Sequence, residues 1–146
     1  KIINFFPDRG FSQPDVDEFN TQMDFEYTRI RDFIILHYKL TTRDDSPFWR
    51  RCRDMPVPDS LTQRMALYRQ HGRIFREGLE LFTPVGWLQV MHGQGLKPEG
   101  YHPLVDVYGE QEVLDFLQGI ETVIGKCVEV MPGHAEFIAK HCAAGR

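Results

Sequence analysis

Two carboxylates and an aromatic ring fall within six consecutive positions, because Glu77 and Glu80 precede Leu81 and Phe82. A carboxylate beside an aromatic wall can act as an acid or a base, or can bind a cationic group of a ligand. The alternative is a solvated turn with both carboxylates in water, and the local pattern favours this alternative. What the segment does therefore depends on the elements that hold it.

The histidines and glycines make no complete catalytic or metal site. His134 and His141 are seven positions apart, but two ligands alone do not hold a metal, so we expect surface or capping roles and no bound metal. His37 follows an apolar segment and is expected to be a hydrogen-bonded core histidine. Gly93 and Gly95 supply only the first two glycines of a GxGxxG signature, after a helix-like segment.

Other catalytic signatures are missing as well. The sequence has no GxxxxGK[ST], GxSxG or HExxH motif. The residues alone therefore show no complete active site. The net charge of −4 also gives no electrostatic footprint for nucleic acid. The densest basic cluster, residues 50–53, lies between aspartates at 44–45 and 54, which predicts a solvated, internally paired surface.

Length, hydropathy and cysteine content bound the class of protein. The 146 residues suit one domain with a sizeable core. No apolar run approaches the roughly 20 residues of a membrane helix, and no signal peptide is evident. Cys52, Cys127 and Cys142 are widely spaced and odd in number, which indicates a reducing, cytoplasmic setting. The chain begins at Lys1 inside an apolar stretch, so we expect a piece of a longer protein.

Helices are expected to position these residues, because apolar side chains recur in steps of three and four. The longest such pattern covers residues 14–38 and becomes fully apolar at 33–36, which predicts a buried central helix. Ser46 and Pro47 have the types expected at the cap and first position of a short helix.

Further helices follow in the second half of the chain. Ser60 and Gln63 have capping-box spacing for a helix that ends at Gly72. Residues 84–93, 113–131 and 134–142 are predicted helices, and residues 101–106 are expected to form an extended loop. Strand alternation and internal repeats are absent. The predicted fold class is mainly α, an irregular helical subdomain or bundle.

Three segments together resemble the C-terminal part of flavin-dependent tryptophan halogenases. They are residues 26–38 (EYTRIRDFIILHY), 42–49 (TRDDSPFW) and 58–60 (PDS). Residues 101–106 (YHPLVD) continue the resemblance, and residues 107–146 follow by position more than by motif. The resemblance implies that residues 1–146 are the helical, substrate-side region of a longer flavoenzyme, packed on an FAD-binding α/β domain outside this chain.

The resemblance also implies an activity and its partners. Reduced FAD, oxygen and chloride or bromide would yield hypohalous acid, which halogenates an indole or another electron-rich ring beside a lysine and a glutamate. Those two residues, the GxGxxG and a Trp-x-Trp-x-Ile-Pro motif belong to the part of the family that precedes this region. The resemblance therefore implies that this chain has neither a catalytic residue nor a cofactor-binding residue. A separate flavin reductase is an expected partner, nucleic acid and membrane are not, and a homodimer is left open.

Within this chain the resemblance implies substrate contacts. It assigns Phe82 to the ring that stacks on the indole, Leu81 to the position beside it, and Glu77 to the glutamate that holds the amino group. Trp87 is a further candidate for the pocket wall, with core packing as the alternative. The family's Tyr-Tyr pair falls at Gln70-His71 and is absent, so a simpler indole is at least as good a candidate as tryptophan.

Two other functions stay open at this point. One is a helical binding module without flavin, and the other is a related flavin monooxygenase that does not halogenate.

Overall fold

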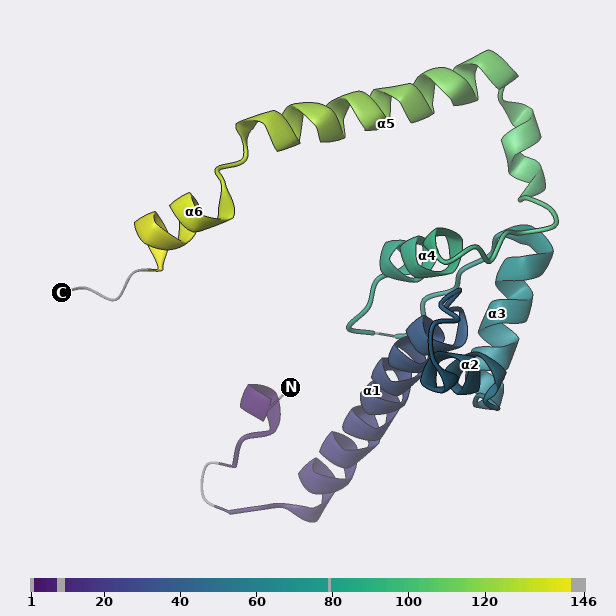
Figure 1. Ribbon diagram of the computed structural model, residues 1–146. Coiled ribbons are helices and arrows are strands. Elements are labelled where there is room, and N and C mark those ends of the chain that lie inside the picture. The colour runs from purple at the N-terminus through teal and green to yellow at the C-terminus, as the bar shows by residue number, and fades with distance from the viewer. Residues whose placement is uncertain (1, 8–9, 79, 143–146) are drawn as a thin grey trace. The chain divides into compact units, whose positions relative to one another are not determined.

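The structure is a computed structural model that describes residues 2–7, 10–78 and 80–142. The chain divides into two compact units, Lys1–His102 and Pro103–Arg146. Every regular element among the described residues is a helix (Figure 1). The mainly α fold class predicted from the sequence is thereby confirmed.

Helix α1, Gln13–Lys39, is the long central helix that the apolar pattern predicts. It begins where the Ser12 side chain accepts a hydrogen bond from the Asp15 backbone N–H, which satisfies one of the free donors of the first turn. It contacts α2, α3 and α4, which gather around its C-terminal half in Figure 1. Its buried side chains are Phe33, Leu36 and, unexpectedly, Asp32.

Helices α2, Pro47–Asp54, and α3, Asp59–His71, lie where short helices were predicted, but the predicted caps are wrong in detail. Ser46 has the extended backbone of an N-cap, yet its side chain makes no capping hydrogen bond. Ser60 is not a cap, because α3 begins at Asp59 and the Ser60 hydroxyl donates to the carboxylate of Asp32. Ser60 thus bonds to Asp32 of another helix instead of to a backbone N–H of its own helix.

Helix α3 ends at Gly72 as predicted, in the left-handed region with φ 66°. Helix α4, Pro84–Gly93, is capped by the Thr83 hydroxyl, which accepts from the backbone N–H of Gly86. The core of the first unit lies where α1, α3 and α4 meet. Its buried members are Phe33, Leu36, Leu61, Tyr68, Trp87, Met91 and Leu96.

Two short segments form 3₁₀ helices, and the second of them differs from expectation. The apolar opening forms a 3₁₀ helix, η1, at Ile2–Phe5. The segment expected to be an extended loop at residues 101–106 contains a second 3₁₀ helix, η2, at Pro103–Val107. Pro103 supplies the first residue of η2, because a fixed φ near −65° suits a helical turn as well as an extended segment.

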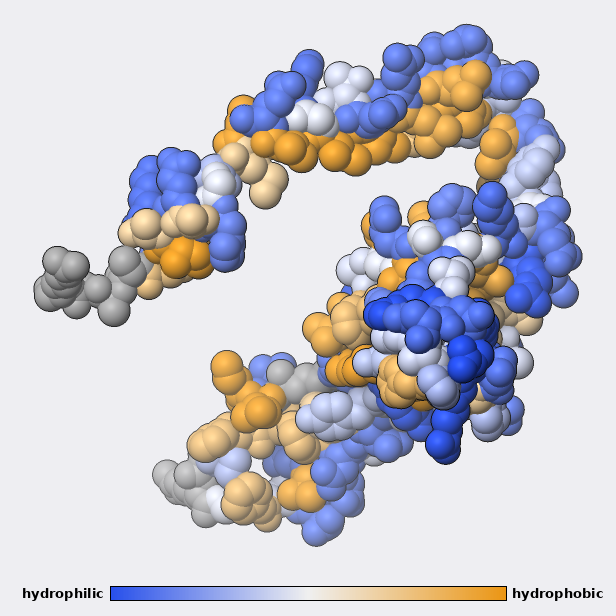
Figure 2. Space-filling view, viewed as in Figure 1, coloured by the Kyte–Doolittle hydropathy of each residue, from blue (hydrophilic) through white to orange (hydrophobic). Residues whose placement is uncertain are grey.

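The second unit contains η2 and two predicted helices, α5 at Glu110–Val130 and α6 at His134–His141. Neither of these helices has a buried residue. Apolar side chains gather along one side of α5 in Figure 2. The exposed apolar residues of α5 include Leu114, Leu117, Ile120, Ile124 and Val128.

Candidate aromatic binding site

The segment between α3 and α4 carries Glu77, Glu80, Leu81 and Phe82, and a buried ion pair anchors it. Arg64 on α3 donates to both carboxylate oxygens of Glu80, at 2.8 and 3.3 Å, and to the backbone carbonyl of Phe75 at 3.3 Å. The exposed fractions are 9% for the Arg64 side chain and 1% for that of Glu80. The solvated turn that the local pattern favoured is therefore wrong for Glu80.

Glu77 lies at the outer end of the same network. Its side chain is 52% exposed and forms an ion pair with Arg29 of α1. Its backbone N–H donates to Glu80 at 3.1 Å, which ties the two acidic residues together. The Arg29 guanidinium also lies 3.9 Å from Asp32 and 4.0 Å from Glu80, so positive charge from α1 faces three carboxylates.

Phe82 stacks on Phe33 of α1, with ring centroids 3.9 Å apart and planes at 20°. Trp87 of α4 meets Phe33 edge-on at 4.9 Å. The Arg64 guanidinium lies over the Trp87 ring, 4.3 Å from its centroid. The anchoring cation and the aromatic stack therefore form one continuous assembly, in which each neighbour limits how far Phe82 can move.

An open pocket of about 540 Å³ lies beside this stack. Its apolar wall contains Phe33, Ile34, Tyr38, Trp49 and Phe82, and its polar members are His37, Thr41 and Gln94. The Tyr38 and Trp49 rings are nearly parallel, with centroids 6.0 Å apart. A pocket of this size, mostly apolar with a few polar groups, suits a small aromatic ligand.

The four residues assigned by resemblance do not all meet in that pocket. Phe82 lines it, whereas Leu81 is 59% exposed and is not among its lining residues. Glu77 lines a separate, smaller hollow with Arg64 and Ser60. Trp87 is 1% exposed and lies behind Phe33 in the core, with its indole N–H unpaired.

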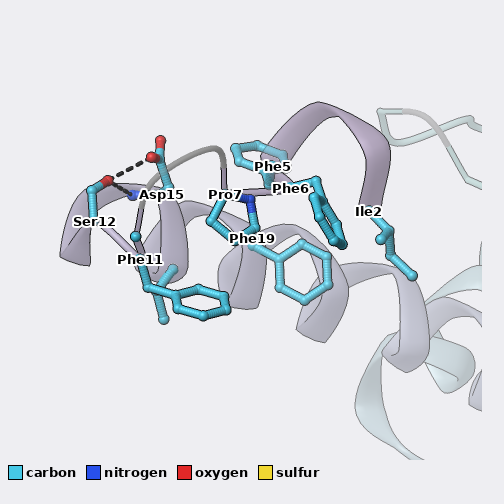
Figure 3. Close-up of a pocket in the computed structure, with 10 residues that line it drawn as sticks. Ile2, Phe5, Phe6, Pro7, Phe11, Ser12, Asp15 and Phe19 are labelled. Carbon is cyan, nitrogen blue, oxygen red and sulfur yellow. Dashed lines mark hydrogen bonds between the residues drawn. The ribbon is translucent and has the colours of Figure 1, made fainter.

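A second apolar hollow, of about 510 Å³, lies at the start of the chain (Figure 3). Phe5, Phe6, Phe11 and Phe19 line it, with the Phe5 and Phe19 rings edge-on at 6.1 Å, and the Ser12 and Asp15 cap forms one edge. The only hydrogen bonds drawn among its lining residues belong to this cap. The hollow thus offers shape and apolar surface but little chemistry, and we take the pocket beside Phe82 as the candidate site.

Sequence reasoning missed two charged residues that matter here. Arg64 lies three positions after Leu61 and four before Tyr68, both fully buried, so it falls on the buried stripe of α3. A cation on a buried stripe needs an anionic partner, and that requirement is the signal that could have revealed Glu80. Asp32, 2% exposed, falls within the stripe of α1 in the same way and is bonded to Arg31 and Ser60.

His37 is hydrogen-bonded as expected, but it is not a core residue. Its Nδ1 lies 2.8 Å from the backbone carbonyl of Phe33, and the side chain is exposed at the pocket. The histidines at the far end of the chain are also exposed, and the His141 ring packs on Phe137.

The groups with shifted pKa values lie outside the pocket wall. Burial raises the pKa of Tyr68 above its ordinary value, and its hydroxyl lies 3.5 Å from His92 Nδ1. On an exposed face, the hydrogen bond from Arg43 lowers the pKa of Asp45. In the predicted basic cluster nearby, Arg53 pairs with Asp44 at 3.0 Å and Arg50 with Asp44 at 3.6 Å, which confirms internal pairing.

The described residues do not fit a flavin. A dinucleotide site of the GxGxxG type follows a strand and places phosphate at a helix N-terminus. Gly93 and Gly95 lie instead at the C-terminal end of α4, and the described part of the chain has no strand.

The described residues also offer neither a metal site nor a membrane span. They contain no group of three or more His, Cys, Asp or Glu side chains arranged to hold a metal ion. None of their helices combines the length and the apolar character that crossing a membrane requires.

Fold and pocket together define a helical region that presents a mostly apolar, aromatic-walled pocket. Comparison with known proteins gives the family. The protein-family model described as "Tryptophan halogenase" matches residues 1–110, and the chain belongs to this family.

Three relatives illustrate the match. The tryptophan 6-halogenase ThaL of Streptomyces albogriseolus is 36% identical over 128 residues, which cover 78% of this chain and 24% of the relative. The solved structure of Xcc4156, a flavin-dependent halogenase from Xanthomonas campestris, matches with TM-score 0.85 and 44% identity over 99% of this chain and 29% of that one.

BrvH, a flavin-dependent halogenase from Brevundimonas sp. BAL3, matches with TM-score 0.80 and 43% identity over 94% of this chain and 28% of that one. The chain therefore spans about a quarter of the length of the curated relatives that it matches.

Proposed function

We propose that this chain is the substrate-side, C-terminal helical region of an FAD-dependent halogenase that chlorinates or brominates an indole-type arene. The observation that carries the proposal is the position of Phe82, half-buried at the edge of an aromatic pocket and stacked on Phe33. Family membership supports the reaction class, and the aromatic pocket supports the substrate class.

The pocket's aromatic rings suit an arene because rings attract one another in offset or edge-to-face contact. In this proposal Phe82 contacts the substrate ring, Leu81 is its exposed neighbour in the chain, and Trp87 supports the stack through Phe33. FAD, halide and hypohalous acid belong to the rest of the enzyme, which also receives reduced flavin from a separate reductase.

The contacts of Glu77 favour a substrate without an amino-acid head group. A carboxylate binds an ammonium group well when its charge is not already used. Here Arg29 pairs with Glu77, and Glu77 lies outside the lining of the pocket that contains Phe82. We therefore propose indole or a simple indole derivative as a better substrate than free tryptophan.

The test is product analysis with the enzyme that carries this chain. It is supplied with FAD, a flavin reductase and bromide, and is offered indole and tryptophan separately. Mass spectrometry should find brominated indole in larger yield than brominated tryptophan. If the product is a hydroxylated arene without bromine, the enzyme is a non-halogenating monooxygenase and the proposal is wrong. If no arene is converted at all, the 540 Å³ pocket is not a substrate site.

A further inference from the structure

One ring nitrogen of His37 has its role fixed by the backbone. The carbonyl of Phe33 can only accept, so Nδ1 of His37, 2.8 Å away, is the donor. A neutral imidazole has one donor and one acceptor, and Nε2 is therefore the acceptor. Phe33 lies one turn earlier on α1, and its ring also meets the imidazole edge-on at 4.8 Å.

These contacts fix the orientation of His37 while leaving Nε2 available. Within the described part of the chain, no hydrogen bond uses Nε2, and the side chain is an exposed part of the pocket wall. Of the other polar members of the wall, the Thr41 hydroxyl already accepts from the backbone N–H of Arg43 at 3.3 Å. His37 is thus an acceptor with a defined tautomer beside Phe33, whose ring stacks on Phe82.

We infer that His37 Nε2 accepts a hydrogen bond from a ring N–H of the aromatic ligand, so that the pocket selects arenes bearing a donor. Indole N–H is a donor only, which matches an acceptor on an otherwise mostly apolar wall. The occupant is the substrate of the proposed function, so the inference rests on that proposal. The binding step can nevertheless be measured without any halogenation.

The experiment compares 1-methylindole and 2-methylindole, which are isomers of equal size. Only the 2-methyl isomer keeps its N–H, so other differences between the ligands are small. Calorimetric titration of the enzyme that carries this chain, without halide, should give about fivefold tighter binding of 2-methylindole, the usual worth of one neutral hydrogen bond. Equal affinity for the two isomers overturns the inference.

His37→Phe keeps a ring of similar size but has no acceptor, and it should bind the two isomers equally. His37→Leu serves in its place if His37→Phe loses its helical circular dichroism. The control is His134→Phe, which replaces an exposed histidine of α6. This variant should keep the fivefold preference for 2-methylindole. A preference that survives in the folded His37 variant also overturns the inference.

The outcomes separate this inference from the proposed function. Absence of any brominated product, with the N–H preference intact, removes the halogenase proposal and leaves the hydrogen bond standing. Bromination of indole by an enzyme that binds both isomers equally removes only the role of His37.

Discussion

Phe82 and Phe33 stack face to face at 3.9 Å, although they are far apart in sequence and come from a loop and a helix. The stack gives an irregular segment a position as definite as that of a helical residue. Phe33 is itself 8% exposed and is fixed by the edge of Trp87, so movement of Phe82 would disturb the core. Rigid support of this kind is what a binding wall requires.

Phe82→Ala should raise KM for indole about tenfold, because it removes a ring contact and part of the apolar wall. The rate of flavin reduction should not change, since the described residues hold no flavin site. Steady-state bromination assays and flavin absorbance measure the two quantities. Phe75→Ala, which truncates an exposed ring in the same segment, is the matched control and should leave KM unchanged. An unaltered KM in Phe82→Ala would remove Phe82 from the binding site.

Arg29→Met should leave kcat/KM for tryptamine relative to indole unchanged, because Glu77, although released from its ion pair, lies outside the pocket that contains Phe82. The neighbouring carboxylates keep other partners, because Asp32 retains Arg31 and Glu80 retains Arg64. Competition between the two substrates, followed by mass spectrometry, gives the ratio directly.

The double variant Arg29→Met/Glu77→Gln is the control for this prediction. It should give the same tryptamine-to-indole ratio as Arg29→Met, because the charge of Glu77 does not reach the pocket. A ratio that rises in Arg29→Met and returns to the wild-type value in the double variant would show instead that Glu77 does reach a substrate amine.

Glu80→Ala should lower the free energy of unfolding by about 3–5 kcal/mol, because it leaves the buried Arg64 guanidinium without its anion. Urea denaturation followed by circular dichroism measures the loss. Asp45→Ala, at the exposed pair with Arg43, should change the midpoint very little. Replacing both partners, as Arg64→Met/Glu80→Leu, should recover much of the lost stability. A small effect of Glu80→Ala would show that the pair does not anchor the segment.

Stability should fall as the pH rises above about 10, through the ionisation of Tyr68. Burial raises the pKa of Tyr68 in the folded chain, so the unfolded chain loses this proton first. Since the folded state then holds more protons, the slope of unfolding free energy against pH is negative in this window. Tyr68→Phe should have a shallower slope in urea titrations at pH 9 to 11. Equal slopes would contradict the assignment.

The sequence predicted helices well because their signals are local. The recurring apolar residues of α1 and the glycine at position 72 gave a helix and a helix end that the structure confirms. The caps were less predictable, because Ser60 has a choice between a backbone N–H nearby and the carboxylate of Asp32 in another helix. Local spacing cannot say which partner a folded chain will bring closer.

The candidate site shows the same limit more strongly. Phe82 could be singled out by resemblance, but its stacking on Phe33 depends on how the segment between α3 and α4 returns to α1. The partner of Glu77 lies 48 positions earlier in the chain, and no sequence spacing encodes that pair. The unused acceptor on His37 was missed because it depends on a hydrogen bond to a backbone carbonyl, which every residue possesses.

The chain's two tryptophans occupy contrasting surroundings. Trp87 is sealed in the core under a guanidinium, and Trp49 is half-buried at the pocket beside Tyr38. Within this chain, the two tryptophans therefore provide two optical reporters. Emission from Trp87 should shift to longer wavelength only when the core opens to water, whereas emission from Trp49 should respond to a ligand in the pocket. Occupancy and unfolding can thus be followed separately without an attached dye.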